Sequence, residues 1–293
     1  MKGTRRFLIV AAVVLGLAVA LVGIAYAITN GEPDGDAHPY VGLLVFDVEL
    51  PDGSQVPAWR CSGALIAPNL VLTAGHCTDG AVAARIWFEE GPIAAVWDDP
   101  PGEYPLGGTT SYEGIPYTNP DYGTGSLGKG LPAFDYRDVG VIVLDEPVTC
   151  ADVGRCAILP AAGLVDTLKN KTDIDFVGYG VQYQAQIPGK DVPQPPPYNR
   201  WTGPRVRLYA PSQLVSGKFV HASEFMRLSL NPGGGKGGTC FGDSGGPDLL
   251  GGTDTVLAVN SYVTNYNCAG VGYSSRVDIP EVLDWIINEE YLD

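Results

Sequence analysis

Short apolar runs, rich in β-branched residues and separated by Gly, Pro, Asp and Asn, recur along most of the chain. Residues 40–48 form one such run and predict a strand that ends at a turn over 51–53. Two more runs flank the Pro-Asn pair at 68–69, a pattern typical of a β-hairpin. The counts of 39 Gly and 24 Pro also fit many turns and short strands. The pattern therefore predicts an all-β protein.

Two segments depart from the strand pattern. Four apolar residues near the C-terminus recur at helical spacing and form one face: Val282, Leu283, Ile286 and Ile287. Pro280 suits the first turn of a helix and Asp278 is placed to cap it, so we expect a C-terminal helix within 278–293. Residues 98–131 are rich in Gly, Pro, Tyr and Asp and are expected to form a surface loop.

The N-terminal segment has the pattern of an export signal. It opens with three cations, Lys2, Arg5 and Arg6. An uncharged apolar stretch follows over 7–24, and Ala-Tyr-Ala at 25–27 is a small-x-small cleavage signature. We expect residues 1–27 to be a signal peptide whose removal leaves a free α-ammonium on Ile28. The alternative is a retained membrane anchor, because the stretch over 7–24 is close to the length of about 17–25 residues that spans a bilayer.

The composition of the 293 residues narrows the class of protein. Apolar residues make up 45%, which is typical of a globular chain, and 18 Lys and Arg against 33 Asp and Glu give a net charge of −15. A surface of that sign repels nucleic acid, so we expect no nucleic-acid partner. The six cysteines form no Cys-x-x-Cys pair, which favours disulfides in an oxidising compartment over a metal site. Cys61 and Cys77 lie at the two ends of the predicted hairpin, where a disulfide would close it.

A candidate nucleophile lies in residues 239–247, Thr-Cys-Phe-Gly-Asp-Ser-Gly-Gly-Pro. Ser244 sits among glycines, which suits a sharp turn whose backbone N–H groups point at a reacting oxygen. Asp243 is adjacent in sequence and too close to orient a base for this serine, so it needs another partner.

A base and an orienting carboxylate are also present. Of the three histidines, His38, His76 and His221, His76 ends the hairpin beside Cys77 and follows two small residues that leave room for its ring. Asp138 directly precedes an apolar strand and could accept a hydrogen bond from Nδ1 of an imidazole. Asp135 is the alternative for that role.

Together these motifs resemble the trypsin/chymotrypsin family of serine endopeptidases. Four stretches carry the resemblance, in the family's order: Ile-Thr-Asn-Gly at 28–31, Thr-Ala-Gly-His-Cys at 73–77, Asp-Val-Gly-Val at 138–141 and Gly-Asp-Ser-Gly-Gly-Pro at 242–247. Ser-Tyr-Val at 261–263 is similar to the family's substrate-binding strand. The resemblance implies two antiparallel six-stranded β-barrels with the active site between them. Residues 28–150 would form the first barrel and 151–277 the second.

The same resemblance implies a mechanism. Ser244 would attack a peptide carbonyl, His76 would act as general base and Asp138 would orient it. The N–H groups of Gly242 and Ser244 would form the oxyanion hole. Asp243 would pair with the ammonium of Ile28 once signal peptidase has cut. No cofactor or metal is implied, and we expect a secreted monomer that acts on protein or peptide substrates.

The resemblance also implies disulfides and a specificity pocket. The further disulfides would be Cys150–Cys156 and Cys240–Cys268. The pocket residues would be Gly238, Thr239, Ser261, Tyr262, Val263 and Gly272. Trypsin-like members carry an aspartate where this chain has Gly238, and Val263 replaces a glycine at the pocket mouth. We therefore expect a small or medium apolar side chain before the scissile bond.

Three alternatives remain at this point. One is a catalytically silent homologue that acts as a binding module. Another is a protease tethered to a membrane by residues 1–27, facing outside. A lipase of the α/β-hydrolase type is disfavoured, because that fold runs Ser, Asp, His along the chain and this sequence runs His76, Asp138, Ser244.

Overall fold

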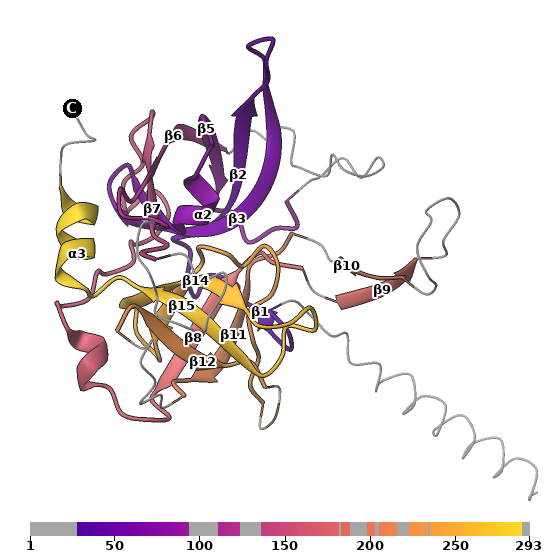
Figure 1. The fold of residues 1–293 in the computed structure, drawn as a ribbon, viewed down its shortest axis with the longest axis vertical. Helices are drawn as coiled ribbons and strands as arrows, with labels where there is room; N and C mark the ends of the chain where they lie inside the picture. Colours follow the sequence, from indigo (N-terminus) through magenta and orange to yellow (C-terminus); the bar gives the residue numbers. More distant parts are fainter. Residues whose placement is uncertain are drawn as a thin grey trace, which may run out of the picture.

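The computed structural model describes residues 28–93, 111–123, 136–181, 183–187, 198–202, 205–215, 223–231, 233 and 235–288. The predicted signal peptide lies outside these residues. Figure 1 shows two strand-rich bodies in contact, the first indigo to magenta and the second orange to yellow. No helix among the described residues is long and apolar enough to span a membrane.

The first body is a closed barrel of six antiparallel strands in the order β2-β3-β4-β7-β6-β5. Its strands are β2 (Val41–Glu49), β3 (Gln55–Ala67), β4 (Leu70–Thr73), β5 (Ala83–Trp87), β6 (Tyr112–Thr118) and β7 (Gly140–Leu144). The predicted hairpin is confirmed, because β3 and β4 pair across a turn in which Asn69 has φ of 63°. Asn residues tolerate this left-handed conformation better than most others do.

The second body is a seven-stranded sheet in the order β1-β11-β8-β13-β14-β15-β12. Its strands are β1 (Glu32–Pro33), β8 (Asp173–Gly178), β11 (Leu208–Gln213), β12 (Phe225–Ser229), β13 (Pro247–Leu250), β14 (Val256–Val263) and β15 (Val271–Arg276). An isolated bridge between Leu214 and Leu228 joins the ends of β11 and β12, so the sheet curls toward closure. The prediction of six strands missed β1, which extends the sheet beside β11.

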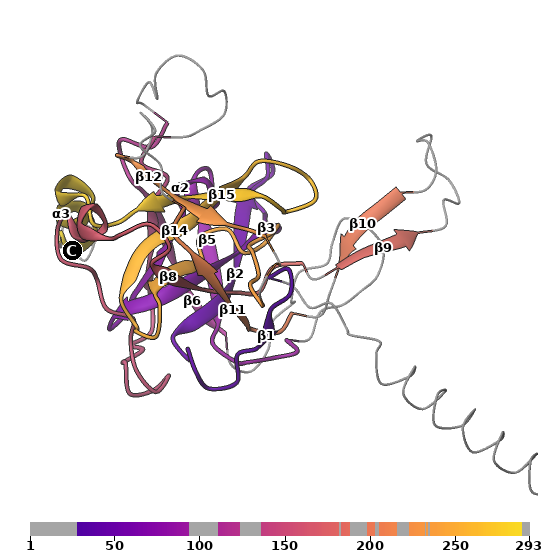
Figure 2. The same cartoon turned by 90° about the horizontal axis from the view of Figure 1, so that it is seen from below.

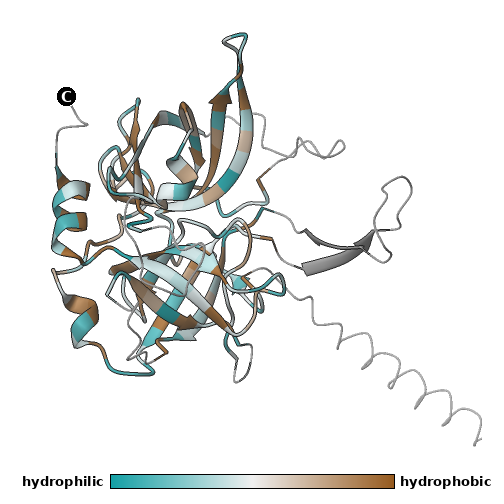
Figure 3. Cartoon of the chain, in the orientation of Figure 1, coloured by the Kyte–Doolittle hydropathy of each residue, from teal (hydrophilic) through white to brown (hydrophobic). Residues whose placement is uncertain are grey.

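Alternating burial defines the inner faces of both bodies. In β11 every second residue from Leu208 to Ser212 is buried, as expected when side chains alternate across a sheet. In Figure 3 brown apolar and teal hydrophilic segments follow one another along the strands. Two hydrophobic clusters result. One fills the first body and continues into Val177, Leu249 and Val259 of the second, and the other lies within the second body and includes Ile28.

The remaining elements are not strands of the barrel or of the seven-stranded sheet. They are β9 (Tyr183–Ile187), β10 (Tyr198–Thr202), α2 (Gly75–Thr78), α3 (Pro280–Ile287) and the 3₁₀ turn η1 (Leu164–Thr167). The paired strands β9 and β10 project away from the sheets in both Figure 1 and Figure 2. The helix α3 confirms the C-terminal prediction and buries Val282 and Ile286.

Two sequence predictions were wrong. The segment 98–131 is not a loop throughout, because β6 lies within it and pairs with both β5 and β7. Asp278 does not cap α3, since its carboxylate instead binds the Arg276 guanidinium and the Val165 N–H. Both errors come from tertiary pairing that local sequence does not encode.

All three expected disulfides are formed: Cys61–Cys77, Cys150–Cys156 and Cys240–Cys268. The Cys61–Cys77 disulfide joins β3 to the short helix α2. Cys150–Cys156 closes a small loop, and Cys240–Cys268 joins two segments of the second body. Because two of the pairs flank the candidate catalytic residues, the disulfides also fix the local backbone of the site.

Candidate active site

His76 and Asp138 form a hydrogen-bonded pair in the first body. Nδ1 of His76 lies 2.8 Å from Oδ2 of Asp138, and the backbone N–H of His76 donates to Oδ1 at 2.6 Å. Asp138 is 2% exposed, whereas the His76 side chain is 31% exposed. When the carboxylate accepts from Nδ1–H, Nε2 is left as the basic nitrogen. The arrangement is that of a general base held by a carboxylate.

Close packing explains the glycine that precedes His76. A Cβ atom at Gly75 would lie 3.1 Å from the Val139 nitrogen and 3.2 Å from Asp138 Oδ1. Helix α2 begins at Gly75, so the absence of a side chain lets the helix approach the carboxylate. Asp135, the alternative to Asp138, lies outside the described residues.

The other two histidines have different positions. His38 donates its backbone N–H to Asp34, and its Nδ1 lies 2.6 Å from Asp34 Oδ1. Asp34 in turn accepts from the buried guanidinium of Arg207. This ion-pair network is remote from the His76 pair along the chain, and His221 lies outside the described residues.

The turn at 242–246 shapes the surroundings of Ser244. Gly242 has φ of 92° and Gly245 has φ of 74°, conformations that side chains of L-residues rarely adopt. The Ser244 carbonyl accepts from the Ser62 N–H of β3 at 2.8 Å, and the Gly245 N–H donates to Asn260 of β14 at 2.8 Å. The turn is therefore anchored to both bodies.

Asp243 is fully buried beneath this turn. Its two carboxylate oxygens accept from the Gly180 N–H at 2.8 Å and the Cys240 N–H at 2.9 Å. Burial raises its pKa to about 7, while these N–H groups and the charge of Arg60 oppose the rise. Arg60 was not predicted from the sequence. Its guanidinium lies beside Gly242, since Nε would be 3.3 Å from a Cβ atom there.

A contact between the two bodies places Asp138 and Ser244 near one junction. The Ser261 hydroxyl of β14 donates to Oδ2 of Asp138, whose own chain segment belongs to the first body. The sequence had assigned Ser261 to the substrate pocket alone. Figure 1 shows α2 at the face of the first body that meets the second.

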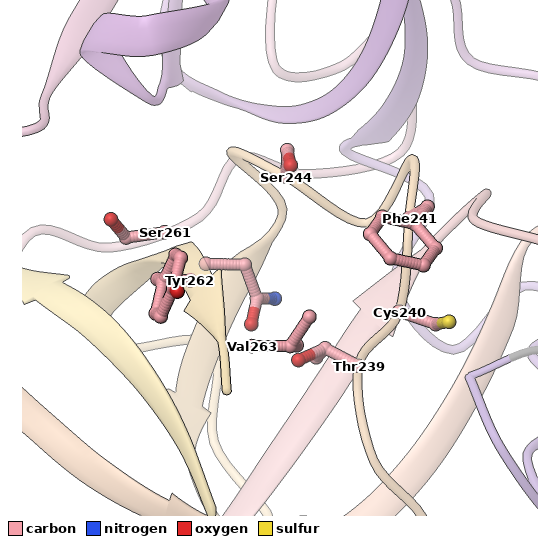
Figure 4. A pocket seen from close by; sticks show the side chains of 8 residues that line it. Thr239, Cys240, Phe241, Ser244, Ser261, Tyr262 and Val263 are labelled. Atoms are coloured by element: carbon pink, nitrogen blue, oxygen red, sulfur yellow. The ribbon is translucent and has the colours of Figure 1, made fainter. Parts of the chain in front are cut away.

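Ser244 also borders a pocket in the second body. The pocket is lined by Thr239, Cys240, Phe241, Ser244, Asn260, Ser261, Tyr262 and Val263. Figure 4 shows Ser244 at one end, with Val263 and Thr239 facing each other away from it. Four of the six predicted pocket residues are among the lining residues. Sequence analysis did not assign Phe241 to the pocket, although Phe241 lies within the 239–247 stretch, and it missed Asn260, which no motif marks.

Gly238 and Gly272, the other two predicted pocket residues, are not among the lining residues. Both instead pack against Leu230. A Cβ atom at Gly238 would lie 2.8 Å from Leu230 Cβ, and one at Gly272 would lie 3.0 Å from Leu230 Cδ2. Leu230 is fully buried, so it fills the space beside both glycines.

The ligand atoms of Cys61, His76 and Cys77 cluster within 4.8 Å of one another. Zinc sites use cysteine as thiolate, and the two sulfur atoms here are joined to each other. This cluster therefore lacks the donor atoms for such a site.

The comparisons with known proteins agree with this fold and arrangement. The family model described as Trypsin matches residues 37–286. Chymotrypsin-like elastase family member 3A of Homo sapiens is 26% identical over 240 residues, covering 77% of this chain and 76% of the relative. Family member 3B of Macaca mulatta is 27% identical over 256 residues, covering 82% and 84%.

Solved structures show the same fold. One titled HL collagenase has a TM-score of 0.59 at 19% identity, covering 88% of this chain and 94% of the other. A mutant of human heparin binding protein has a TM-score of 0.56 at 16% identity, covering 92% and 98%. With the family model matching most of its length, the chain belongs to the trypsin family and is a serine endopeptidase.

Proposed function

We propose that this serine endopeptidase uses a triad of Ser244, His76 and Asp138 and passes through an acyl-enzyme. The Ser244 hydroxyl attacks the peptide carbonyl as Nε2 of His76 takes its proton. His76 then protonates the leaving amine, and water releases the acyl group. The observation that carries the proposal is the hydrogen bond that Asp138 accepts from Nδ1–H of His76, because it leaves Nε2 as the base.

The turn before the serine supplies the second part of the mechanism. The N–H groups of Gly242 and Ser244 stabilise the negative charge that develops on the carbonyl oxygen. The positive φ of Gly242 supports this role, because it turns that peptide unit in a way other residues resist. Losing one such donor typically costs about 10²–10³ in turnover.

Labelling by a fluorophosphonate probe tests the nucleophile. The secreted protein should be labelled and should cleave peptides, and Ser244→Ala should lose both. Conversion of Ser54 to Ala is a matched control, since Ser54 is an exposed serine in the turn between β2 and β3 and makes no contact with the turn around Ser244. Unlabelled wild-type protein would favour the silent homologue instead.

For the alternative of a binding module, one similar solved structure is that of a protein named for its ligand, the heparin binding protein. Heparin is a polyanion. This chain has a net charge of −15, which opposes binding of a polyanion. The same charge also opposes binding of nucleic acid, so we propose no nucleic-acid partner. The likeness to that protein therefore favours the shared fold rather than a shared ligand.

We also propose secretion and activation by one cut after Ala27. The ammonium of Ile28 then pairs with Asp243, which otherwise has only Arg60 as a counter-charge among its described neighbours. Two observations support this pairing. Ile28 is fully buried, and Thr29 exchanges backbone hydrogen bonds with Gly238 at 2.7 and 3.1 Å. N-terminal sequencing of the secreted protein tests it, and a start other than Ile28 would contradict it.

For specificity, we propose a small or medium apolar side chain before the scissile bond. No acidic residue is among the described residues that line the pocket, and the apolar side chain of Val263 faces Thr239 across it. A peptide library on the secreted protein, with Ser244→Ala as background, should give Ala, Val and Leu the highest rates. Cleavage confined to Lys and Arg would refute this preference.

A further inference from the structure

Asp248 is the least compensated buried charge in the described part of the second body. It is fully buried, and both of its carboxylate oxygens lack a hydrogen-bond partner. Burial raises its pKa well above the ordinary value, and the nearby charge of Asp243 raises it further. No cation among the described residues opposes this. An unpartnered buried carboxylate is costly, so it is uncommon without a function.

The strand register places Asp248 beside the specificity pocket. Asp248 of β13 is opposite Ala258 of β14, and Asn260, two residues further along β14, is on the same face. Asn260 lines the pocket and is opposite Ser274 of β15. Asp248 therefore lies one row behind the pair formed by Asn260 and Ser274, on the inner face of the sheet.

Two residues that the strand register places near Asp248, Asn260 and Ser274, are polar. The Ser274 hydroxyl is close enough to oppose the rise in the pKa of Asp248, although it forms no hydrogen bond within normal distance and angle limits. The Asn260 amide donates to the Gly246 carbonyl at 3.3 Å, and no described residue donates to the amide oxygen of Asn260. The Thr239 hydroxyl is likewise without a partner among the described residues. The inner wall of the pocket thus offers two hydrogen-bond acceptors, the Asn260 amide oxygen and the Thr239 hydroxyl, and the carboxylate of Asp248 lies behind Asn260.

We infer that Asp248 is a specificity-determining residue, which makes the pocket favour lysine over an uncharged side chain of equal length before the scissile bond. The inference rests on the proposed function. A lysine ammonium that passes the acceptors of Thr239 and Asn260 gives the carboxylate the opposite charge that it lacks. The small apolar side chains proposed above stop short of this wall, so their rates are independent of Asp248.

The primary experiment compares two peptide substrates that differ only in lysine or norleucine before the scissile bond. The mature enzyme should have the higher kcat/KM for lysine. Asp248→Asn should reduce the ratio of lysine to norleucine about tenfold, as expected for loss of a hydrogen bond to a charged group. Asp284→Asn, on the exposed side of α3, changes the net charge equally and should leave the ratio unchanged.

The alanine substrate shows whether Asp248→Asn is folded, because its rate should stay near the wild-type value. Asn260→Leu, which replaces the amide between the pocket and Asp248 with an apolar group, should also lower the ratio. Equal rates for lysine and norleucine in the wild-type enzyme would overturn the inference. A ratio that Asp248→Asn leaves unchanged would overturn it as well.

A binding measurement separates this inference from the proposed mechanism. In Ser244→Ala, n-butylamine should bind more tightly than n-butanol by ligand-observed NMR, and adding Asp248→Asn should remove the difference. Equal binding of the two probes would overturn the role of Asp248. Failure of the fluorophosphonate to label Ser244 would overturn the mechanism, and the amine measurement would still report on Asp248.

Discussion

Asp138 illustrates how much of this site is decided by single hydrogen bonds. Its carboxylate accepts from the backbone and ring of His76 and from the Ser261 hydroxyl. Three donors leave the carboxylate little freedom to rotate, so it holds the imidazole in one orientation and one tautomer. An amide in its place would present a donor to the ring and favour the wrong tautomer.

Asp138→Asn should therefore lower kcat by about 10⁴ with little change in KM, because binding does not depend on the tautomer. Steady-state kinetics on a single peptide substrate measures this. Asp145→Asn, an exposed aspartate just after β7, is the control. A loss of less than about tenfold would show that His76 does not depend on Asp138.

The pKa of Asp243, raised to about 7, predicts a pH dependence of stability while Ile28 remains peptide-bonded. The folded state then keeps the proton to a higher pH than the unfolded chain. Stability therefore falls as pH rises from the usual carboxyl range to about 7, and levels off above it. The free ammonium of Ile28 should reduce this fall by stabilising the carboxylate.

Thermal melts of Ser244→Ala between about pH 4 and pH 8, a range that includes the pKa of about 7 of Asp243, test this sign. One chain should retain Ala27, and the other should begin at Ile28. The Tm should decrease more steeply with pH in the chain that retains Ala27. Equal slopes in the two chains would contradict the pairing of Ile28 with Asp243.

At the scale of the element, the turn around Ser244 depends on backbone shape and on tight packing. Gly245 has φ of 74°, and a Cβ atom there would lie 2.0 Å from the Thr73 hydroxyl oxygen of β4. Gly252 has nearly the same φ, 72°, with nothing within 4 Å of the Cβ position. Alanine substitutions at these two glycines therefore distinguish the cost of a strained φ, which both share, from the cost of steric overlap, which only Gly245 has.

Gly252→Ala should cost about 1 kcal/mol of unfolding free energy, from strain alone. Gly245→Ala should cost clearly more and should also reduce labelling of Ser244, because the turn must move away from Thr73. Urea unfolding and fluorophosphonate labelling measure the two effects. Equal costs would mean that the turn has room to relax.

The disulfides predict a second contrast between elements. Removing Cys240–Cys268, which spans 28 residues, should cost about 3–4 kcal/mol by the loop-entropy relation and weaken substrate discrimination, since Cys240 lines the pocket. Removing Cys150–Cys156, which spans 6, should cost about 2 kcal/mol and leave discrimination unchanged. Serine replacements, unfolding curves and the peptide library provide the comparison. Unchanged discrimination without Cys240–Cys268 would contradict its role.

The sequence anticipated elements whose pattern is local and missed those that depend on distant pairing. The β3–β4 hairpin and α3 follow from adjacent residues, through the turn at Asn69 and the helical spacing of apolar residues. By contrast, β6 contains Gly114 and Pro116, which mark loops in sequence, yet β5 and β7 supply its partners. Likewise β1 has only two residues and exists because β11 lies beside it.

At the scale of the whole molecule, the site is made from both bodies. Ser261 of the second body binds Asp138 of the first, and Ser62 of the first body binds the Ser244 carbonyl. His76, Asp138 and Ser244 lie in recognisable motifs, so the sequence alone was enough to propose them. Asn260, Asp248 and Arg60 have no motif, because their positions follow from sheet register and from the approach of β3 to the turn.

The net charge also acts at this scale. Removal of residues 1–27 takes away three positive charges, which changes −15 to −18. We expect kcat/KM for a peptide with several Lys residues distant from the scissile bond to fall as NaCl rises, because salt screens long-range attraction. A neutral peptide of the same length should be insensitive. Equal salt dependence of the two peptides would rule out electrostatic steering.

The hydrogen bond between Ser261 and Asp138 has a consequence for the order in which the enzyme loses activity and structure over time. The hydrophobic cluster of the first body continues into Val177, Leu249 and Val259 of the second, so apolar packing holds the same junction that this hydrogen bond spans. Under the proposed mechanism, the first loosening already releases the carboxylate that orients the base. A molecule whose junction has loosened therefore loses its activity before it unfolds, and it does not persist as a partly unfolded but active protease.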